Sequence, residues 1–188
     1  MIDYARIGEA VKYYTARNYK LIEVPWLVSK EAASLAIPEG RTLYESSAGF
    51  LPASGEQCFL DMRLKGNLPD GKYVCVTPCF RDEPVLDVLH RQTFMKVELI
   101  QMHTTVPYDV DEHLIFMVED AQRFMACQGL RTMAIHQPPA IFGECYSYDI
   151  EHKGIELGSY GVRSYEGHTW VYGTGLAEPR FSQALLRL

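Results

Sequence analysis

The stretch that decides the fold is residues 76–98, VTPCFRDEPVLDVLHRQTFMKVE, whose pattern predicts a strand, a short loop and a returning strand. The outgoing half, Tyr73 to Phe80, is rich in residues that favour β-structure. The returning half, Thr93 to Gln101, alternates between a mixed polar face and a mostly apolar face. The sequence therefore predicts an antiparallel hairpin at the centre of the chain.

The tip of this hairpin carries Arg81 and Glu83, which strand alternation places on one side, facing Phe94 and Glu98. A guanidinium group can form two parallel hydrogen bonds to a phosphate. An aromatic ring can stack on a base, and a carboxylate can accept a hydrogen bond from an exocyclic amine. These side chains suit a ligand with both a phosphate and a flat base. The alternative is a surface hairpin that carries only an ion pair.

Composition indicates an ordinary globular protein. The 188 residues fit one domain, residues 1–188, with 47% hydrophobic and 22% charged residues. The net charge of −6 provides no basic field that would attract nucleic acid. No apolar run approaches the ~20 residues of a membrane span, and the N-terminus does not resemble a secretory signal. We therefore expect a cytoplasmic protein without a membrane segment.

The five cysteines lack CxxC spacing, and their odd number favours reduced thiols over a disulfide framework. A zinc site built from these cysteines and the six histidines is the alternative, but no pair has the usual ligand spacing. We expect no zinc.

The remaining pattern predicts an antiparallel α+β protein rather than alternating βαβ units. Before the central hairpin we expect a helix from Asp3 to Asn18, a strand over Tyr19–Val28 interrupted by Pro25, a short helix over Ser29–Leu35, a long loop over 36–57, and a helix or strand over Phe59–Leu64. After the hairpin we expect a helix that is opened by Pro107 and Asp109 and ends near Gln128. Four strands should follow, at Thr132–His136, Cys145–Glu151, Ile155–Tyr160 and Trp170–Gly175, and then a helix from about Ala177. Proline belongs at a sheet edge or where pairing stops, so Pro25 is expected at an edge or an interface.

Three features that are separate in sequence point to one chemistry. Arg81 follows a strand, Arg180 lies at a glycine-flanked helix start, and Glu156 with Ser159 lies on the strand pair before it. Two arginines for phosphates, with a carboxylate and a hydroxyl for a divalent cation, indicate a nucleoside triphosphate site. Neither GxxxxGK[ST] nor GxGxxG occurs, so this is not a P-loop or a dinucleotide fold.

These motifs together resemble the catalytic core of class II aminoacyl-tRNA synthetases. The closest resemblance is to the seryl-tRNA synthetase group, including its amino acid:carrier-protein ligase relatives. The matches span nearly the whole chain in the family's order. They are Tyr19–Leu27 with Pro25 for the first motif; Phe80, Arg81, Glu83, His90, Phe94 and Glu98 for FRxE and (R/H)xxxFxxxE; Gly173–Arg180 for the third motif; and Ser54–Glu56, Tyr148–Glu151 and Glu156–Ser159 for the seryl TAE, YDLE and EISS segments.

The resemblance implies a fold and a set of roles. The fold is an antiparallel sheet of about six strands flanked by helices, dimeric through the first motif. Arg81 and Arg180 would be the catalytic residues, acting by positioning and electrostatics. ATP would be bound by Arg81, Glu83, His90, Arg91, Phe94 and Arg180; Mg²⁺ by Glu156 and Ser159; and the amino acid by Ser54, Glu56, Glu98 and Thr174. Each residue also has a structural alternative, such as a strand-face charge for Glu98.

Some positions depart from the seryl pattern. Tyr172 stands where that group has Asn, and Gly158 replaces a Ser, so a small amino acid is expected without a commitment to serine. Ser54 and Tyr160 lie where the carrier-protein ligases have zinc-binding cysteines, which again predicts no zinc. The loop Pro84–Leu89 is short and apolar, and no tRNA-binding coiled coil or anticodon-binding domain is expected.

Two functions remain open at this point. The first is a minimal ligase that forms an aminoacyl-adenylate from ATP and a small amino acid. It would transfer the acyl group to a carrier protein, a peptide or a small molecule. Binding to tRNA would be weak, in the tens of micromolar or poorer. The second is a catalytically silent paralogue that binds an amino acid or nucleotide and regulates a partner. The intact Arg81, Glu83, Phe94, Glu156 and Arg180 favour the first.

Overall fold

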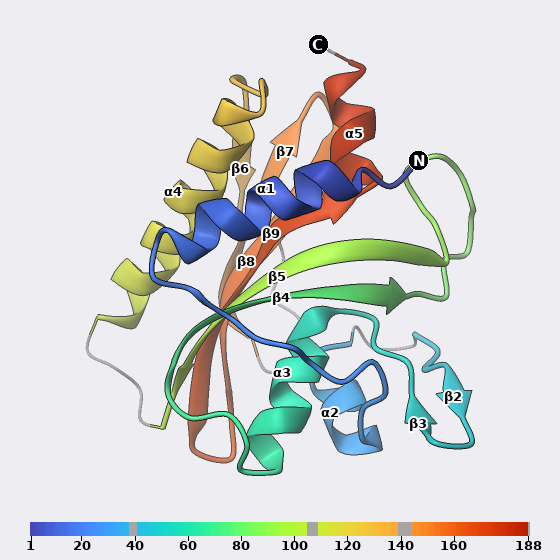
Figure 1. Cartoon of the computed structure of the whole chain (residues 1–188), viewed down its shortest axis with the longest axis vertical. Coiled ribbons are helices and arrows are strands. Elements are labelled where there is room, and N and C mark those ends of the chain that lie inside the picture. Colours follow the sequence, from blue (N-terminus) through green and yellow to red (C-terminus); the bar gives the residue numbers. More distant parts are fainter. Residues whose placement is uncertain (38–40, 105–108, 139–143, 188) are drawn as a thin grey trace.

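The computed structural model describes residues 1–37, 41–104, 109–138 and 144–187 (Figure 1). Its main sheet has seven strands in the order β1-β4-β5-β9-β8-β7-β6. Their bounds are β1 Lys20–Leu21, β4 Gly71–Phe80, β5 Thr93–His103, β6 Ala134–His136, β7 Glu144–His152, β8 Ile155–Tyr165 and β9 His168–Glu178. Strand β1 pairs with β4 in parallel, and the other neighbours pair antiparallel. A small hairpin, β2 (Glu45–Ser46) and β3 (Gly49–Phe50), lies apart from this sheet.

The predicted central hairpin is confirmed as β4 and β5, which pair along their full length. Because side chains alternate along a strand, Phe94, Lys96 and Glu98 of β5 share one face of the sheet. Their register partners on β4 are Cys79, Thr77 and Cys75. The hairpin thus presents an aromatic ring and two opposite charges to the same side.

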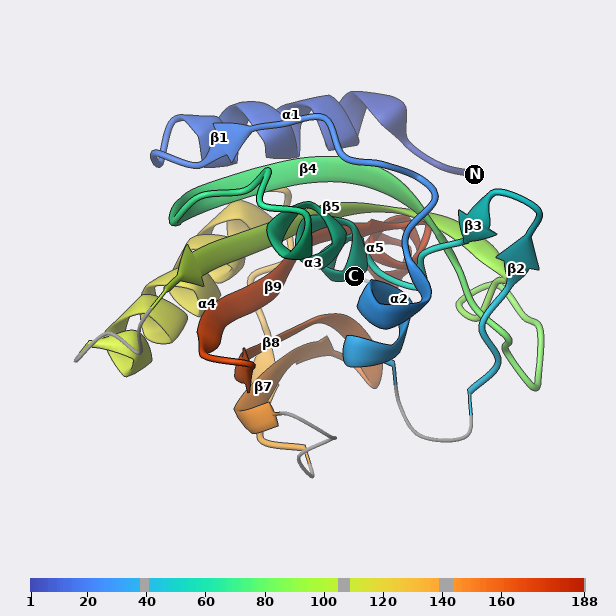
Figure 2. The ribbon, with the colours of Figure 1, turned by 90° about the horizontal axis from the view of Figure 1, so that it is seen from below.

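Helices cover both faces of the sheet. Helices α1 (Tyr4–Thr15), α4 (Val110–Cys127) and α5 (Arg180–Leu185) pack on one face, and α2 (Lys30–Leu35) and α3 (Gly55–Leu64) on the other (Figures 1 and 2). The apolar stripe predicted for α4 is buried in the first of these layers, at Leu114, Met117, Val118, Ala121, Phe124 and Met125. In the described ranges, no helix is long and apolar enough to cross a membrane.

The α+β class is confirmed, and three local expectations need correction. The sheet has seven strands instead of about six, and one neighbouring pair is parallel. The strand expected over Tyr19–Val28 pairs only at Lys20–Leu21, and the chain leaves the sheet before Pro25, which lacks the N–H that pairing needs. The last helix begins at Arg180, because Ala177 is still paired with Lys96 in β9.

Two further expectations have a simpler outcome. The segment at Phe59–Leu64, left open between helix and strand, is helical as part of α3. Pro107, expected to open α4, lies outside the described residues.

The outer side of α1 and β1 is the expected dimer interface. Both elements lie outside β4 (Figure 2), and Tyr4, Leu21 and Trp26 are 68%, 50% and 58% exposed. Two-fold interfaces are self-complementary, so a single charged substitution at the interface is introduced twice. We expect light scattering to show a dimer at micromolar concentration, and Trp26→Glu to convert it to a monomer. Ile115→Glu, at an exposed apolar residue of α4, is the matched control and should leave the mass unchanged. A monomeric parent protein would refute the interface.

Candidate active site

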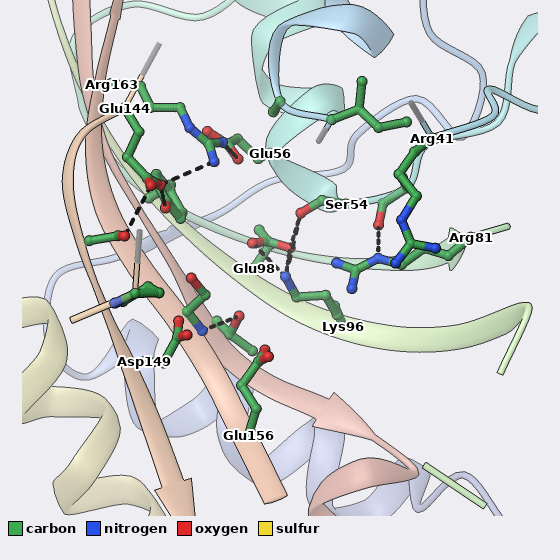
Figure 3. Close-up of a pocket in the computed structure, with 18 of the residues that line it drawn as sticks. Arg41, Ser54, Glu56, Arg81, Lys96, Glu98, Glu144, Asp149, Glu156 and Arg163 are labelled. Atoms are coloured by element: carbon green, nitrogen blue, oxygen red, sulfur yellow. Dashed lines mark hydrogen bonds and ion pairs between the residues drawn. The ribbon is translucent and has the colours of Figure 1, made fainter. Parts of the chain in front are cut away.

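One face of the sheet carries a row of polar side chains across four strands. Asp149 of β7 pairs in register with Ser159 of β8, and Glu98 of β5 pairs with Thr174 of β9. The Ser159 amide donates to the Thr174 hydroxyl over 3.4 Å, which joins the two halves of the row. Strands separated along the chain by up to 76 residues thus contribute to one row, of which Figure 3 labels Glu98 and Asp149.

A β-bulge explains how Glu156 and Ser159 come to share this face. Residues three apart on a regular strand point to opposite sides. Here Ile150 pairs with Gly158 while Glu151 pairs with Glu156, so β8 has one extra residue. An extra residue reverses the alternation beyond it, which turns both side chains to the same side.

Two adjoining pockets open on this face. The larger has a volume of about 270 Å³ and is lined by the residues predicted for the amino acid, together with Ser159. The smaller, of about 30 Å³, is lined by the residues predicted for the nucleotide, except His90. The residues that line both are Arg81, Glu83, Lys96, Glu156 and Thr174. A ligand that extends from one pocket into the other would therefore pass Arg81 and Lys96.

Arg81 is held in place on the nucleotide side. Its Nε donates to the Ala53 carbonyl over 3.1 Å, and its guanidinium carbon lies 5.0 Å from the centre of the Phe94 ring. Among the described residues, the two terminal nitrogens of Arg81 have no hydrogen-bond partner. They are thus available to a phosphate group, for which a guanidinium fork is well suited.

Three other nucleotide-side residues have protein partners. Arg180 Nη1 lies 3.2 Å from Glu156 Oε1, and Glu83 lies 3.8 Å from Arg41. The structure does not bring His90 to either pocket. Its ring pairs with Asp87 at 3.0 Å, and hydrogen bonds from His90 lower the pKa of Asp87 to about 2. His90 therefore fixes the loop conformation.

Glu98 is 1% exposed and lies at the junction of β5 with the start of α3. It accepts hydrogen bonds from the Ser54 hydroxyl at 3.0 Å and the Gly55 amide at 3.1 Å. Lys96 Nζ lies 2.8 Å from the same carboxylate. A Cβ on Gly55 would lie 2.8 Å from the Glu98 Cβ, so only glycine allows this approach. Lys96 received no role from the sequence, although strand alternation already placed it beside Glu98.

Glu56 lies at the deep end of the larger pocket, in the first turn of α3. It accepts from Arg163 Nη1 at 2.5 Å and from the Trp170 indole at 2.6 Å. Burial raises the pKa of Glu56, and the Arg163 charge opposes that rise. Each carboxylate predicted to receive the substrate's ammonium, Glu56 and Glu98, thus already has a buried cation beside it.

Arg163, Glu144 and Tyr172 complete the deep end of the pocket. Arg163 Nη2 lies 3.3 Å from Glu144, and its guanidinium carbon lies 4.2 Å from the centre of the Tyr172 ring. The Tyr172 hydroxyl donates to Glu144. Gly161 faces Tyr172 in register, and a Cβ there would lie 2.6 Å from the Tyr172 hydroxyl oxygen. Sequence reasoning gave Arg163 and Glu144 no role, since only the register between β7 and β8 brings them together.

Asp149 is another site residue without a predicted role. One of its carboxylate oxygens is buried and has no hydrogen-bond partner among the described residues. Burial raises the pKa of Asp149, and the Glu156 and Glu144 carboxylates add to that rise. In the described part of the chain, no group of three His, Cys, Asp or Glu side chains is placed to hold a metal ion. Mg²⁺, however, usually takes one or two carboxylates together with substrate phosphates, and Asp149, Glu156 and Ser159 fit that donor set.

Comparison with known proteins gives structural relatives only. No protein-family model and no curated protein sequence matches the chain. The fold is similar to that of seryl-tRNA synthetase from Pyrococcus horikoshii complexed with ATP, with a TM-score of 0.79 and 18% identity over 98% of this chain. It is also similar to the cytoplasmic serine-tRNA ligase of Naegleria fowleri in complex with AMP (TM-score 0.76, 15% identity, 92% of this chain) and to PylSc, a pyrrolysyl tRNA synthetase of Desulfitobacterium hafniense (0.74, 14%, 97%).

The matched region is a part of each relative. The chain spans 49% and 45% of the two seryl enzymes and 68% of PylSc. The match extends over 92–98% of this chain. The chain therefore has the fold of the class II aminoacyl-tRNA synthetase catalytic core, as its motifs predicted.

Proposed function

We propose that this chain is a single catalytic domain that activates a small amino acid with ATP, forming an aminoacyl-adenylate and pyrophosphate. The observation that carries the proposal is the pair of adjoining pockets, which share Arg81 and Lys96. A nucleotide in the smaller pocket and an amino acid in the larger would meet at these two cations. Holding two reactants at such a junction is a large part of what catalysis requires.

The reaction needs no covalent step on the protein. A carboxylate oxygen of the amino acid attacks the α-phosphorus of ATP, and the bond from that phosphorus to the bridging oxygen breaks as pyrophosphate leaves. Arg81 would hold the α-phosphate and stabilise the negative charge that develops there. Lys96 lies beside the same junction and would attract the attacking carboxylate.

The remaining nucleotide contacts follow from the smaller pocket. Glu83 would accept from the adenine amine, Phe94 would stack on the ring, and Arg91 would assist at the phosphates. Arg180 would bind the γ-phosphate and stack on the other face of the adenine. Arg180 pairs with Glu156 in this structure, and a phosphate would replace the carboxylate as its partner.

We propose Mg²⁺ as the cofactor, held by Glu156 and Ser159 with Asp149 as an additional ligand. When bound, it would offset the charge of the triphosphate. Glu156 would then exchange Arg180 for Mg²⁺, so each member of the ion pair keeps a partner of opposite charge.

The amino-acid contacts support a second candidate function as well. Ser54 and Thr174 border a site for a small amino acid, and Glu56 and Glu98 would receive its ammonium. Because Arg163 and Lys96 already neutralise these carboxylates, the ammonium would compete with buried cations. This observation favours the alternative of a catalytically silent module that binds nucleotide without activating an amino acid.

For the acyl acceptor we propose a carrier protein, a peptide or a small molecule. Binding to tRNA draws on cationic side chains that neutralise phosphates, and this chain has a net charge of −6. The loop beside the smaller pocket also exposes Val85, Leu86 and Val88 instead of cations. These features support weak tRNA binding.

The test is ATP–pyrophosphate exchange across a panel of amino acids, with ATP binding measured in parallel. We expect exchange that depends on one small amino acid. ATP binding without exchange for any amino acid would support the silent module, and no ATP binding would refute both functions. Adding bulk tRNA and labelled amino acid then tests the acceptor, because efficient formation of acid-precipitable aminoacyl-tRNA would overturn that proposal.

A further inference from the structure

Helix α1 contacts β9 where that strand leads into Arg180. Tyr14, which is fully buried, donates its hydroxyl to the Gly175 carbonyl over 2.9 Å. A Cβ on Gly175 would lie 2.8 Å from the Tyr14 ring, so the strand and the helix are in close contact there. Three residues further on, Arg6 Nη1 lies 3.0 Å from Glu178, the last residue of β9.

Arg6 also contacts the chain on the other side of Arg180. Its Nη1 donates to the Ser182 hydroxyl over 2.8 Å, and its guanidinium carbon lies 5.6 Å from the centre of the Phe181 ring. Asp3, the N-cap residue of α1, lies 3.2 Å from the same nitrogen. One guanidinium group therefore contacts residues on both sides of Arg180.

Glu178 is one of the residues that line the smaller pocket, but its carboxylate lies on the helix side of the sheet, where it pairs with Arg6. The register partner of Glu178 is Met95, which packs into the core with α1, whereas Phe94 and Lys96 face the pockets. Glu178 is 0% exposed, and its second carboxylate oxygen has no partner among the described residues. A carboxylate buried in this way depends on Arg6 for its compensating charge.

We propose that Arg6 and Glu178 are positioning residues that fix Arg180 for nucleotide binding. The inference rests on the proposed function, because it assumes that Arg180 binds ATP. The ion pair orders the segment from Glu178 to Ser182 from behind the sheet, and Arg180 reaches the smaller pocket from the middle of that segment. Neither Arg6 nor the Glu178 carboxylate would touch the ligand.

The test uses the double variant Arg6→Gln/Glu178→Gln, which removes both charges together and leaves no unpaired carboxylate in the core. Calorimetry with ATP and with AMP, each with Mg²⁺, gives two affinities for every protein. We expect the dissociation constant for ATP to rise about tenfold, the scale of a coupling between distant sites. The rise for AMP should be smaller, because AMP lacks the γ-phosphate that Arg180 would bind. Arg180→Ala serves as the reference for the full effect.

The control is Arg17→Gln/Asp120→Asn. This pair joins Arg17, which follows α1, to Asp120 of α4 over 3.2 Å, and among the described residues no hydrogen bond or ion pair links it to β9. It should lower thermal stability without changing the ratio of ATP to AMP affinity, which separates positioning from a general loss of structure. An unchanged ratio in the Arg6/Glu178 variant, with a parent that binds ATP, would overturn this inference alone. A parent that binds no ATP would overturn the proposed function and this inference with it.

Discussion

Replacing Arg81 by alanine is expected to lower the rate of amino-acid-dependent ATP–pyrophosphate exchange by about a thousandfold, the scale found for an arginine that stabilises phosphoryl transition-state charge. Arg81 lines both pockets, and it presents two nitrogens without partners among the described residues. Within the described site, no other side chain lines both pockets and also presents two nitrogens without partners. Lys96 also lines both pockets but is paired with Glu98, so it should not replace the charge stabilisation that is lost with Arg81.

Arg81→Lys separates charge from geometry. Lysine keeps the positive charge but lacks the rigid fork and the Nε donor to the Ala53 carbonyl. We expect it to restore only part of the exchange rate. Arg123→Ala, on the exposed side of α4, is the matched control and should keep the parent's rate. Exchange in Arg81→Ala within a few-fold of the parent's would exclude Arg81 from catalysis.

The part of the fold that sequence could predict is the part with a local signal. The hairpin of β4 and β5 shows strand alternation, and α4 shows an apolar stripe, so both are where they were expected. The boundary before Arg180 was misplaced: the last strand was expected to end at Gly175, but β9 continues to Glu178 because Leu176 and Ala177 still pair with β5. The glycines of β9 have a packing role, since a Cβ on Gly173 or Gly175 would collide with the ring of Tyr160 or Tyr14.

In the candidate site, too, the residues with a local sequence signal were predicted and those brought together only by the fold were not. Motif spacing located the residues of the nucleotide pocket, and seven of the predicted site residues line it: Arg81, Glu83, Arg91, Phe94, Glu156, Thr174 and Arg180. The deep end of the larger pocket was not predicted, because Arg163 meets Glu56 across 107 residues and meets Glu144 only through a register set by a bulge. Single-sequence patterns carry no information about such pairings. Arg163 beside Glu56 was missed for this reason, whereas the position of Lys96 beside Glu98 follows from strand alternation.

Arg163→Met is expected to lower the free energy of unfolding by about 3–5 kcal/mol, the usual cost of removing one partner from a buried ion pair. Arg163 and Glu56 are 4% and 3% exposed, and Glu144 also depends on the same guanidinium group. The variant would leave the Glu56 and Glu144 carboxylates in the protein interior without the charge of Arg163, although neutral donors such as Trp170, Tyr172 and Ser147 would remain. Urea unfolding without ligand at neutral pH measures the loss.

The pH dependence gives this prediction a second, independent check. Burial already raises the pKa of Glu56, and removing the opposing charge of Arg163 should raise it further. A group whose pKa is higher in the folded state binds more protons there, so its protonation favours folding as the pH falls. The difference between Arg163→Met and the parent should therefore shrink between about pH 7 and about pH 5.

A second substitution distinguishes lost charge compensation from lost packing. In Arg163→Met/Glu56→Gln the deepest carboxylate becomes neutral, while its shape and the acceptor for the Trp170 indole remain. We expect the double variant to recover more than half of the lost stability at neutral pH and to show little further gain at lower pH. Arg123→Met, which breaks a surface ion pair, should cost about 0.5 kcal/mol or less. If Arg163→Met costs no more than that control, or if its deficit is constant with pH, then Arg163 does not neutralise the deep end of the pocket. Glu56 would in that case remain available for the ammonium of an amino acid.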